Sequence, residues 1–232
     1  MTALPDNWLI YDSAEAVAQA VVEQLLTLSY QAIKTKGAFH LVTAGGTTPN
    51  RCYQLLREQA ADWKHWHIYM GDERVCAADD KNRNSLALMD NWLNFKKIPR
   101  DQIHFIPTEN GMAEAAKAYE EIVSGVKKFD VCLLGMGEDG HTASLFPGHD
   151  YPSDSLVVTE SNSPKPPPQR VSLSFKALKN SHLLLKIITG ASKQSAIQKW
   201  LAGEELPIVK ATGEQTHTYL SRDALPPEIA VE

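Results

Sequence analysis

Hydrophobic and polar residues follow two patterns along this chain, one typical of amphipathic helices and one typical of buried strands. Between residues 14 and 35 the apolar positions recur every three or four residues, which predicts an amphipathic helix. A capping box formed by Asp12 and Glu15 is expected to open this helix, and Gly37 to end it. Beyond it, short apolar runs typical of buried strands alternate with segments of helical spacing. We expect strands at 39–44, 66–70 and 103–106 and from residue 130, and helices from Pro49, over 84–95 and over 112–124.

Strands that alternate with helices predict the α/β class. We expect a mostly parallel, Rossmann-like sheet with helices on both faces, in a single domain that spans residues 1–232. Three successive prolines make residues 161–169 a loop, because proline disrupts both a helix interior and a central strand. After that loop the pattern predicts strands at 170–175, 182–189 and 217–220, and a helix at 192–202.

Composition and charge narrow the function classes. The 232 residues carry a net charge of −5, whereas nucleic-acid-binding proteins usually carry a basic excess, so we expect no nucleic-acid partner. The chain has no apolar run of about 20 residues and no secretion-signal pattern, so we expect neither a membrane span nor export. The three cysteines are widely spaced and match neither a disulfide framework nor a zinc motif. We therefore expect a cytoplasmic protein without a metal.

The strongest candidate for chemistry is the segment 129–149. Its apolar run, expected to form a buried strand, ends in a glycine-rich turn that carries Asp139 and His141. Active sites of parallel sheets lie at the carboxyl ends of strands. With an unperturbed pKa of about 6.5, His141 can act as a base near neutral pH, and Asp139 can hold its ring in one tautomer. A structural histidine is the alternative. Ser144 lies outside a GxSxG motif, so a serine-hydrolase site is not expected.

A second candidate is a glycine-rich turn between a predicted strand and a predicted helix. Glycines let the backbone approach a ligand closely, and the free N–H groups at the start of a helix attract anions. Two threonines add hydroxyl donors. The turn comprises Gly45, Gly46, Thr47 and Thr48 and matches neither a Walker A loop nor GxGxxG, so no nucleotide is implied. An ordinary tight turn remains open.

Three further places carry charges that suit an anionic ligand. Asp72 and Arg74 follow a predicted strand, which is typical either of a polar cleft or of a charged surface turn. Arg170 follows the proline loop, and arginine binds phosphate or carboxylate through two nitrogens. Lys193 falls in the first turn of a predicted helix, where the helix dipole disfavours a cation unless an anion binds there. Solvent-exposed side chains are the alternative at both of these last positions.

Five motifs follow one another along nearly the whole chain: TAGGTTP (43–49), MGDER (70–74), LLGMGEDGHTASLFPGH (133–149), SPKPPPQRVSLS (163–174) and TGASK (189–193). Together they resemble the 6-phosphogluconolactonase family, which belongs to a wider group containing glucosamine-6-phosphate deaminases. The proline-rich motif favours the lactonase branch. Deaminases typically have a tyrosine where Arg74 stands and Ile-Ala-Phe-Asn where this chain has Thr142 to Leu145.

The resemblance implies hydrolysis of 6-phospho-D-glucono-1,5-lactone to 6-phospho-D-gluconate, in the oxidative branch of the pentose phosphate pathway, with no cofactor. By resemblance, His141 activates water and Asp139 orients it, while Arg74 contacts the substrate or the developing anion and Asp72 lines the cleft. The expected phosphate-binding residues are Gly45, Gly46, Thr47, Thr48, Arg170 and Lys193.

Two other functions remain open at this point. A glucosamine-6-phosphate deaminase would release ammonia from its substrate, which a lactonase does not. A non-catalytic sugar-phosphate sensor would bind 6-phosphogluconate without hydrolysing the lactone. The partner expected in every case is a small sugar phosphate, and the sequence indicates no oligomeric state.

Overall fold

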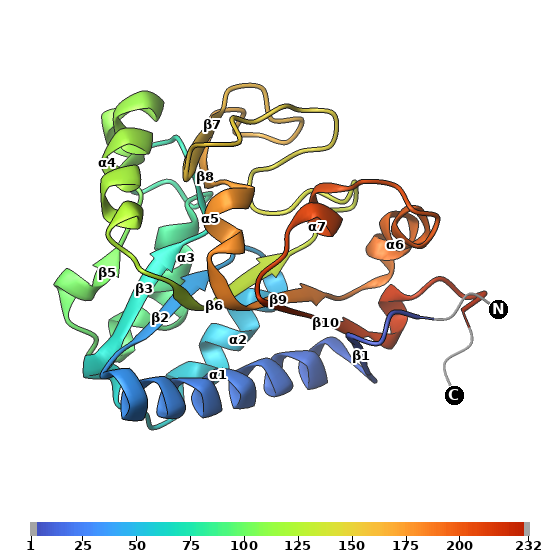
Figure 1. Cartoon of the computed structure of the whole chain (residues 1–232), viewed down its shortest axis with the longest axis horizontal. Coiled ribbons are helices and arrows are strands. Elements are labelled where there is room, and N and C mark those ends of the chain that lie inside the picture. Colours follow the sequence, from blue (N-terminus) through green and yellow to red (C-terminus); the bar gives the residue numbers. More distant parts are fainter. Residues whose placement is uncertain (1–3, 230–232) are drawn as a thin grey trace.

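A parallel sheet of seven strands runs through the computed structural model, which describes residues 4–229 (Figure 1). All its neighbouring strands pair in parallel, as predicted for the α/β class. Across the sheet the strands are β1 (Trp8–Tyr11), β10 (Gln215–Ser221), β9 (Ser181–Ile188), β6 (Phe129–Gly135), β2 (Phe39–Thr43), β3 (Trp66–Met70) and β5 (Ile103–His104). The predicted Rossmann-like sheet is therefore confirmed.

A second sheet was not predicted. It has three antiparallel strands in the order β4 (Asp72–Arg74), β8 (Arg170–Leu173) and β7 (Val157–Glu160). We expected residues 72–74 to be a polar turn or cleft, yet Asp72 and Glu73 are buried. Pairing across the sheet brings Arg74 opposite Arg170, although the two residues are far apart in sequence. The strand predicted at 170–175 is β8, whereas β4 and β7 are too short to show the alternation that identifies a strand from sequence.

Helices cover both faces of the main sheet, as expected (Figure 1). In that view α1 and α2 lie below the sheet, whereas α4 to α7 lie above it. No helix among residues 4–229 is both long and apolar enough to cross a membrane. The helices are α1 (Ala14–Lys36), α2 (Thr47–Arg57), α3 (Asn84–Asn91), α4 (Met112–Ser124), α5 (Phe175–Lys179), α6 (Gln194–Leu201) and α7 (Pro207–Lys210).

The start of α1 corrects one prediction. Ser13, not the pair Asp12 and Glu15, caps this helix: its hydroxyl accepts a hydrogen bond from the backbone N–H of Ala16 at 3.2 Å. Ser13 has the extended backbone that a capping residue requires and stands directly before the first helical residue. Gly37 ends the helix in the left-handed conformation, as expected.

Other boundaries differ by a few residues. Helix α2 begins two residues before Pro49, which is tolerated because the first turn of a helix has no backbone acceptor for its N–H groups. Helix α3 ends at Asn91, and a separate 3₁₀ turn covers Leu93–Phe95. The predicted helix at 192–202 is a 3₁₀ turn, Ala191–Lys193, followed by α6. Of the strand expected at 103–106, only Ile103–His104 pair.

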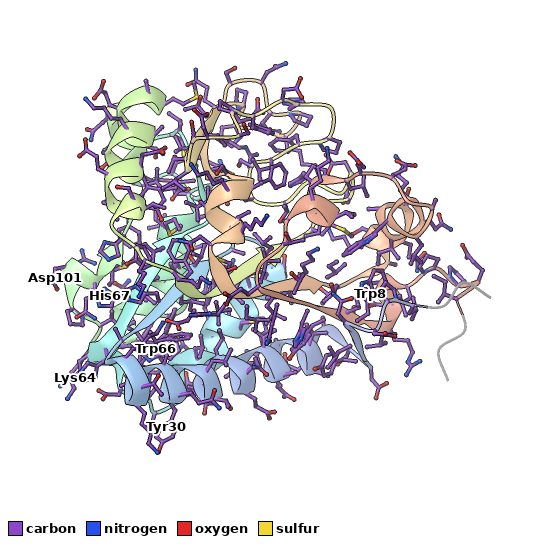
Figure 2. The ribbon with its side chains drawn as sticks, in the orientation of Figure 1. Trp8, Tyr30, Lys64, Trp66, His67 and Asp101 are labelled. Carbon is purple, nitrogen blue, oxygen red and sulfur yellow. The ribbon has the colours of Figure 1, made fainter. Side chains whose placement is uncertain are left out.

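Pairs of aromatic residues pack near both edges of the main sheet. Figure 2 shows Trp66 and Trp8 far apart, at the β3 and β1 ends. Trp66 is fully buried and packs edge-on against Phe39 with ring centroids 4.7 Å apart. Trp8 packs edge-on against Trp200 of α6 at 4.9 Å. Such pairs stabilise a fold beyond the burial of their apolar area.

Lys186 is a charged residue in the middle of this core. It lies on β9, is 2 % exposed, and its ammonium nitrogen is 4.7 Å from the centroid of the Trp200 ring. No carboxylate pairs with it among residues 4–229. Burial lowers the pKa of Lys186 to about 8, because the protein interior disfavours the charged form.

We therefore expect Lys186→Met to stabilise the protein. The pKa of Lys186 is about 8 in the folded chain and 10.5 for an ordinary lysine, so between these values the unfolded chain binds more protons. The free energy of unfolding should then rise with pH from 8 to 10.5, and Lys186→Met should remove that rise. At pH 7 the gain should be about 2–3 kcal/mol by urea unfolding. Lys199→Met, at an exposed position of α6, is the control; a loss of stability in Lys186→Met alone would contradict the argument.

Candidate active site

A cavity of about 510 Å³ opens where β2, β3, β6 and β9 end. The carboxyl ends of parallel strands meet at one edge, so the segments that follow them gather around this space. The cavity wall includes every predicted site residue except Asp139: Gly45, Gly46, Thr47, Thr48, Asp72, Arg74, His141, Arg170 and Lys193. Asp139 lies behind His141 and contacts it directly.

His141 and Asp139 form a close pair in the turn after β6. The ring Nδ1 of His141 lies 2.5 Å from Oδ1 of Asp139, and the backbone N–H of His141 donates to the same oxygen at 3.1 Å. Burial alone would raise the pKa of Asp139, but the hydrogen bond and charge of His141 outweigh it and hold that pKa well below its usual range. An ionised Asp139 accepts from Nδ1, so Nε2 is left as the hydrogen-bond acceptor of a neutral His141 ring.

Glycine is required at two positions of this turn. A Cβ on Gly137 would lie 2.0 Å from Nδ1 of His141 and 2.8 Å from Oδ1 of Asp139. Gly140 has a φ of +84°, and a Cβ there would meet Leu206 at 2.7 Å. The absence of a side chain at Gly137 therefore allows the His141–Asp139 pair to form, and its absence at Gly140 allows the turn to pack against Leu206.

Two helical starts border the same cavity as this pair. Gly46 precedes α2 with a φ of +115° and provides no side-chain cap, so the first N–H groups of the helix remain available to a ligand. Gly190 precedes the turn that leads into α6, with a φ of +91°. The hydroxyl oxygens of Thr48 and Thr189 are 2.5 Å apart and join the two segments. Free N–H groups at a helix start attract anions, so we expect an anion to bind beside these two segments, which we call the anion cradle. Lys193 lines the same cavity.

Arg170 is occupied by the proline loop. It is 3 % exposed, its Nε donates to the carbonyl of Pro167 at 3.1 Å, and its Nη2 donates to the carbonyls of Lys165 at 3.0 Å and Pro166 at 3.4 Å. Burial, followed by repulsion from Arg74, lowers the pKa of Arg170. Arg170 therefore lines the cavity, but two of its three guanidinium nitrogens are hydrogen-bonded to the backbone of the proline loop.

Asp72 is held from two sides. Its Oδ2 accepts from the Ser144 hydroxyl at 2.6 Å, and its Oδ1 accepts from the Asn84 side-chain nitrogen at 3.0 Å. Ser144 is fully buried and has a supporting position. Arg74 donates from Nη1 to the carbonyl of Asn82 at 2.5 Å, while its Nε is buried without a partner among residues 4–229.

Glu73 explains why the Asp-Glu-Arg segment is buried. Its carboxylate accepts from the backbone N–H groups of Asn84 and Ser85, each at 2.8 Å, and so caps the start of α3. The guanidinium of Arg83 lies 3.6 Å from the same carboxylate. Of the two interpretations of this segment, the charged surface turn is wrong, because a carboxylate buried at 0 % exposure needs such partners, and the polar cleft is correct.

Asn84 is a cavity residue that our sequence analysis missed. It lines the cavity, bonds Asp72, and packs so closely on the glycine turn that a Cβ on Gly45 would lie 2.2 Å from its Oδ1. It was not among the predicted site residues, because residues 75–84 are less typical of the family that the sequence resembles. Within residues 4–229, no group of three or more histidine, cysteine or acidic side chains is arranged to hold a metal ion.

Comparisons with known proteins identify the family of this chain. The family model of glucosamine-6-phosphate isomerases/6-phosphogluconolactonase matches residues 12–220. A 6-phosphogluconolactonase of Thermotoga maritima is 32 % identical over 90 % of this chain and 96 % of its own length. A probable chloroplastic 6-phosphogluconolactonase of Oryza sativa is 32 % identical over 96 % of this chain and 70 % of its own length.

Solved structures are similar over nearly the whole chain. The crystal structure of the Thermotoga maritima 6-phosphogluconolactonase has a TM-score of 0.85 at 30 % identity and covers 92 % of this chain and 98 % of its own. A monomeric glucosamine-6-phosphate deaminase has a TM-score of 0.80 at 21 % identity, over 94 % of this chain and 98 % of its own, and shares the fold.

We expect Gly137→Ala to break the contact between His141 and Asp139, because the new Cβ cannot share the space of the ring. Imidazole ¹⁵N chemical shifts of His141 should report loss of the single protonated Nδ1 tautomer. The control is Gly125→Ala, at a φ of −76° and with its nearest atom 3.4 Å from the added Cβ. An unchanged His141 spectrum in a folded Gly137→Ala protein would refute this account of the turn.

Proposed function

This chain belongs to the family of glucosamine-6-phosphate isomerases and 6-phosphogluconolactonases, and on that premise we propose that it hydrolyses 6-phospho-D-glucono-1,5-lactone to 6-phospho-D-gluconate. The reaction is the second step of the oxidative pentose phosphate pathway. One observation carries the proposal: the His141–Asp139 pair borders the same cavity as the anion cradle of α2 and the segment before α6. A substrate with a reactive carbonyl at one end and a phosphate at the other matches that arrangement.

His141 is the proposed general base. Its Nε2 accepts a proton from water as the water oxygen attacks the lactone carbonyl carbon, and the ionised Asp139 stabilises the imidazolium that forms. When the bond from that carbon to the ring oxygen breaks, His141 returns the proton to the departing oxygen, which becomes a hydroxyl. General-base assistance of this kind contributes about 10²–10⁴-fold to the rate.

The anion cradle orients the substrate. Backbone N–H groups from Gly45 to Thr48, with the ammonium of Lys193, are proposed to hold the phosphate. The phosphate lies away from the reacting carbon, so its binding energy fixes the position of the carbonyl relative to His141. Arg74 is the proposed donor to the developing oxyanion or a sugar hydroxyl, since its side chain lines the cavity.

The deaminase alternative rests on the fold and on a family model that covers both activities. The similarity to a glucosamine-6-phosphate deaminase is at 21 % identity, whereas the 6-phosphogluconolactonase relatives reach 32 % over most of the chain. Arg74 in the place of the deaminase tyrosine also favours the lactonase. Ammonia release from glucosamine 6-phosphate is the reaction that would separate the two.

We also propose that residues 1–232 form one lactonase domain that acts in the cytoplasm. The free thiols of Cys52, Cys76 and Cys132 are consistent with a reducing compartment. The Oryza sativa relative is chloroplastic, so cell fractionation is the direct test of location. The net charge of −5 supports a small-molecule partner over nucleic acid.

We expect His141→Ala to lower kcat for lactone hydrolysis by about 10²–10⁴-fold while leaving product binding largely intact. The assay uses freshly generated lactone with its spontaneous hydrolysis subtracted, and the same samples are tested for ammonia release. His182→Ala removes an exposed histidine that contacts Glu214 at 2.7 Å and serves as the control. Turnover near the parent rate in His141→Ala would reject the base assignment.

We expect Lys193→Ala to raise KM about tenfold and to change kcat much less, because the lysine is proposed to bind the phosphate away from the reacting carbon. Unphosphorylated glucono-1,5-lactone is the control substrate, for which the variant and the parent should behave alike. An equal loss with both lactones would show that Lys193 does not recognise the phosphate.

A further inference from the structure

An ion pair beside the cavity links the proline loop to the turn after β6, which carries Asp139 and His141. The ammonium of Lys165 lies 3.7 Å from Oε2 of Glu138, and the two side chains are 44 % and 62 % exposed. Lys165 belongs to the loop 161–169 and lines the cavity, whereas Glu138 directly precedes Asp139. Neither residue was among the predicted site residues.

The backbone that carries Lys165 is firmly held. The carbonyl oxygen of Lys165 accepts from Arg170 at 3.0 Å and from the Ser163 hydroxyl at 2.8 Å. The base of the loop is held by Glu160, whose carboxylate accepts from the backbone N–H of Asn162 at 2.6 Å. Arg170 and Ser163 therefore fix the loop, while the side chain of Lys165 remains half-exposed and able to change partner.

Lys165 and Lys193 line the same cavity, although they belong to two different segments. Both line its wall, and both lie within electrostatic reach of Glu138. Burial lowers the pKa of Lys193 and is the largest effect on it. The charge of Glu138 raises this pKa, and the charge of Lys165 lowers it. The three charges thus lie close together, and without a ligand Glu138 is the carboxylate that contacts Lys165.

We propose that Lys165 and Lys193 form a two-lysine clamp for the substrate phosphate, and that Glu138 is a resident counter-ion which the phosphate displaces from Lys165. This inference rests on the proposed function and names two further residues for the same site. An exposed ion pair is worth only about 0.2–1 kcal/mol, so it is easily exchanged. A phosphate group carries about −1.5 to −2 charges near neutral pH and offers three acceptor oxygens, so it is the stronger partner for two lysines.

The proposal requires opposite effects from the two members of the ion pair. Lys165→Ala should weaken binding of 6-phospho-D-gluconate about tenfold, because it removes a charged hydrogen-bond donor. Glu138→Gln should tighten binding about two- to fivefold, because the phosphate no longer displaces a carboxylate. In the double variant, Glu138→Gln should lose its effect, because Lys165 is no longer there to be released.

Calorimetric titration of the full chain with 6-phospho-D-gluconate, inorganic phosphate and unphosphorylated gluconate measures these effects without turnover. The dissociation constants of parent and variants should differ for both phosphate-containing ligands and be equal for gluconate. The differences should become smaller as the salt concentration rises. Lys210→Ala and Glu205→Gln are the matched controls, because these side chains form another ion pair of exposed residues, at 3.2 Å.

Weaker or unchanged phosphate binding in Glu138→Gln would overturn the counter-ion role, and unchanged binding in Lys165→Ala would overturn the clamp. These failures are distinct from failure of the proposed function. If the parent does not hydrolyse the lactone but the opposite shifts are measured, only the reaction is wrong. If the parent hydrolyses the lactone and the shifts are missing, only the clamp is wrong.

Discussion

Parallel pairing of β9, β6, β2 and β3 is the constraint on which the cavity depends. These strands are neighbours in the sheet, so the segments that follow Ile188, Gly135, Thr43 and Met70 emerge at one edge. In that order, the segments contain Lys193, the His141–Asp139 pair, the start of α2 that is proposed to bind an anion, and the buried acidic strand β4. Because the backbone hydrogen bonds between strands set their relative positions, the groups proposed to meet the two ends of a sugar phosphate are held in place before it binds.

Buried charges hold the wall of the cavity. Glu73 caps α3, which positions Asn84 against both Asp72 and the glycine turn. Arg170 holds the carbonyls of the proline loop and stands opposite Arg74 across the second sheet. A buried charge is costly unless it is paired or hydrogen-bonded, so each of these side chains restricts the segments that satisfy it. The same contacts that stabilise the wall therefore keep its cavity-facing groups in fixed positions.

The cavity separates two electrostatic tasks. Asp139 contacts Nδ1 of His141, and in the proposed reaction it balances the charge that the ring gains. Backbone N–H groups and lysines gather at the other end, where burial raises the free energy of an unpaired ammonium and so favours a bound anion. Glu138 stands between the two regions, next to Asp139 in sequence and beside Lys165 in space.

The sequence by itself determined the α/β class, the parallel sheet and the family, because apolar periodicity and glycine-rich motifs are local properties of the chain. It also singled out His141, Asp139 and the glycine turn, since each is marked by its immediate neighbours. Only the tertiary structure decided the burial of Asp72 and Glu73, the place of Asn84, and the commitment of Arg170 to the proline loop. Those outcomes depend on contacts between residues far apart in sequence, and no local pattern encodes which distant group will satisfy a buried charge.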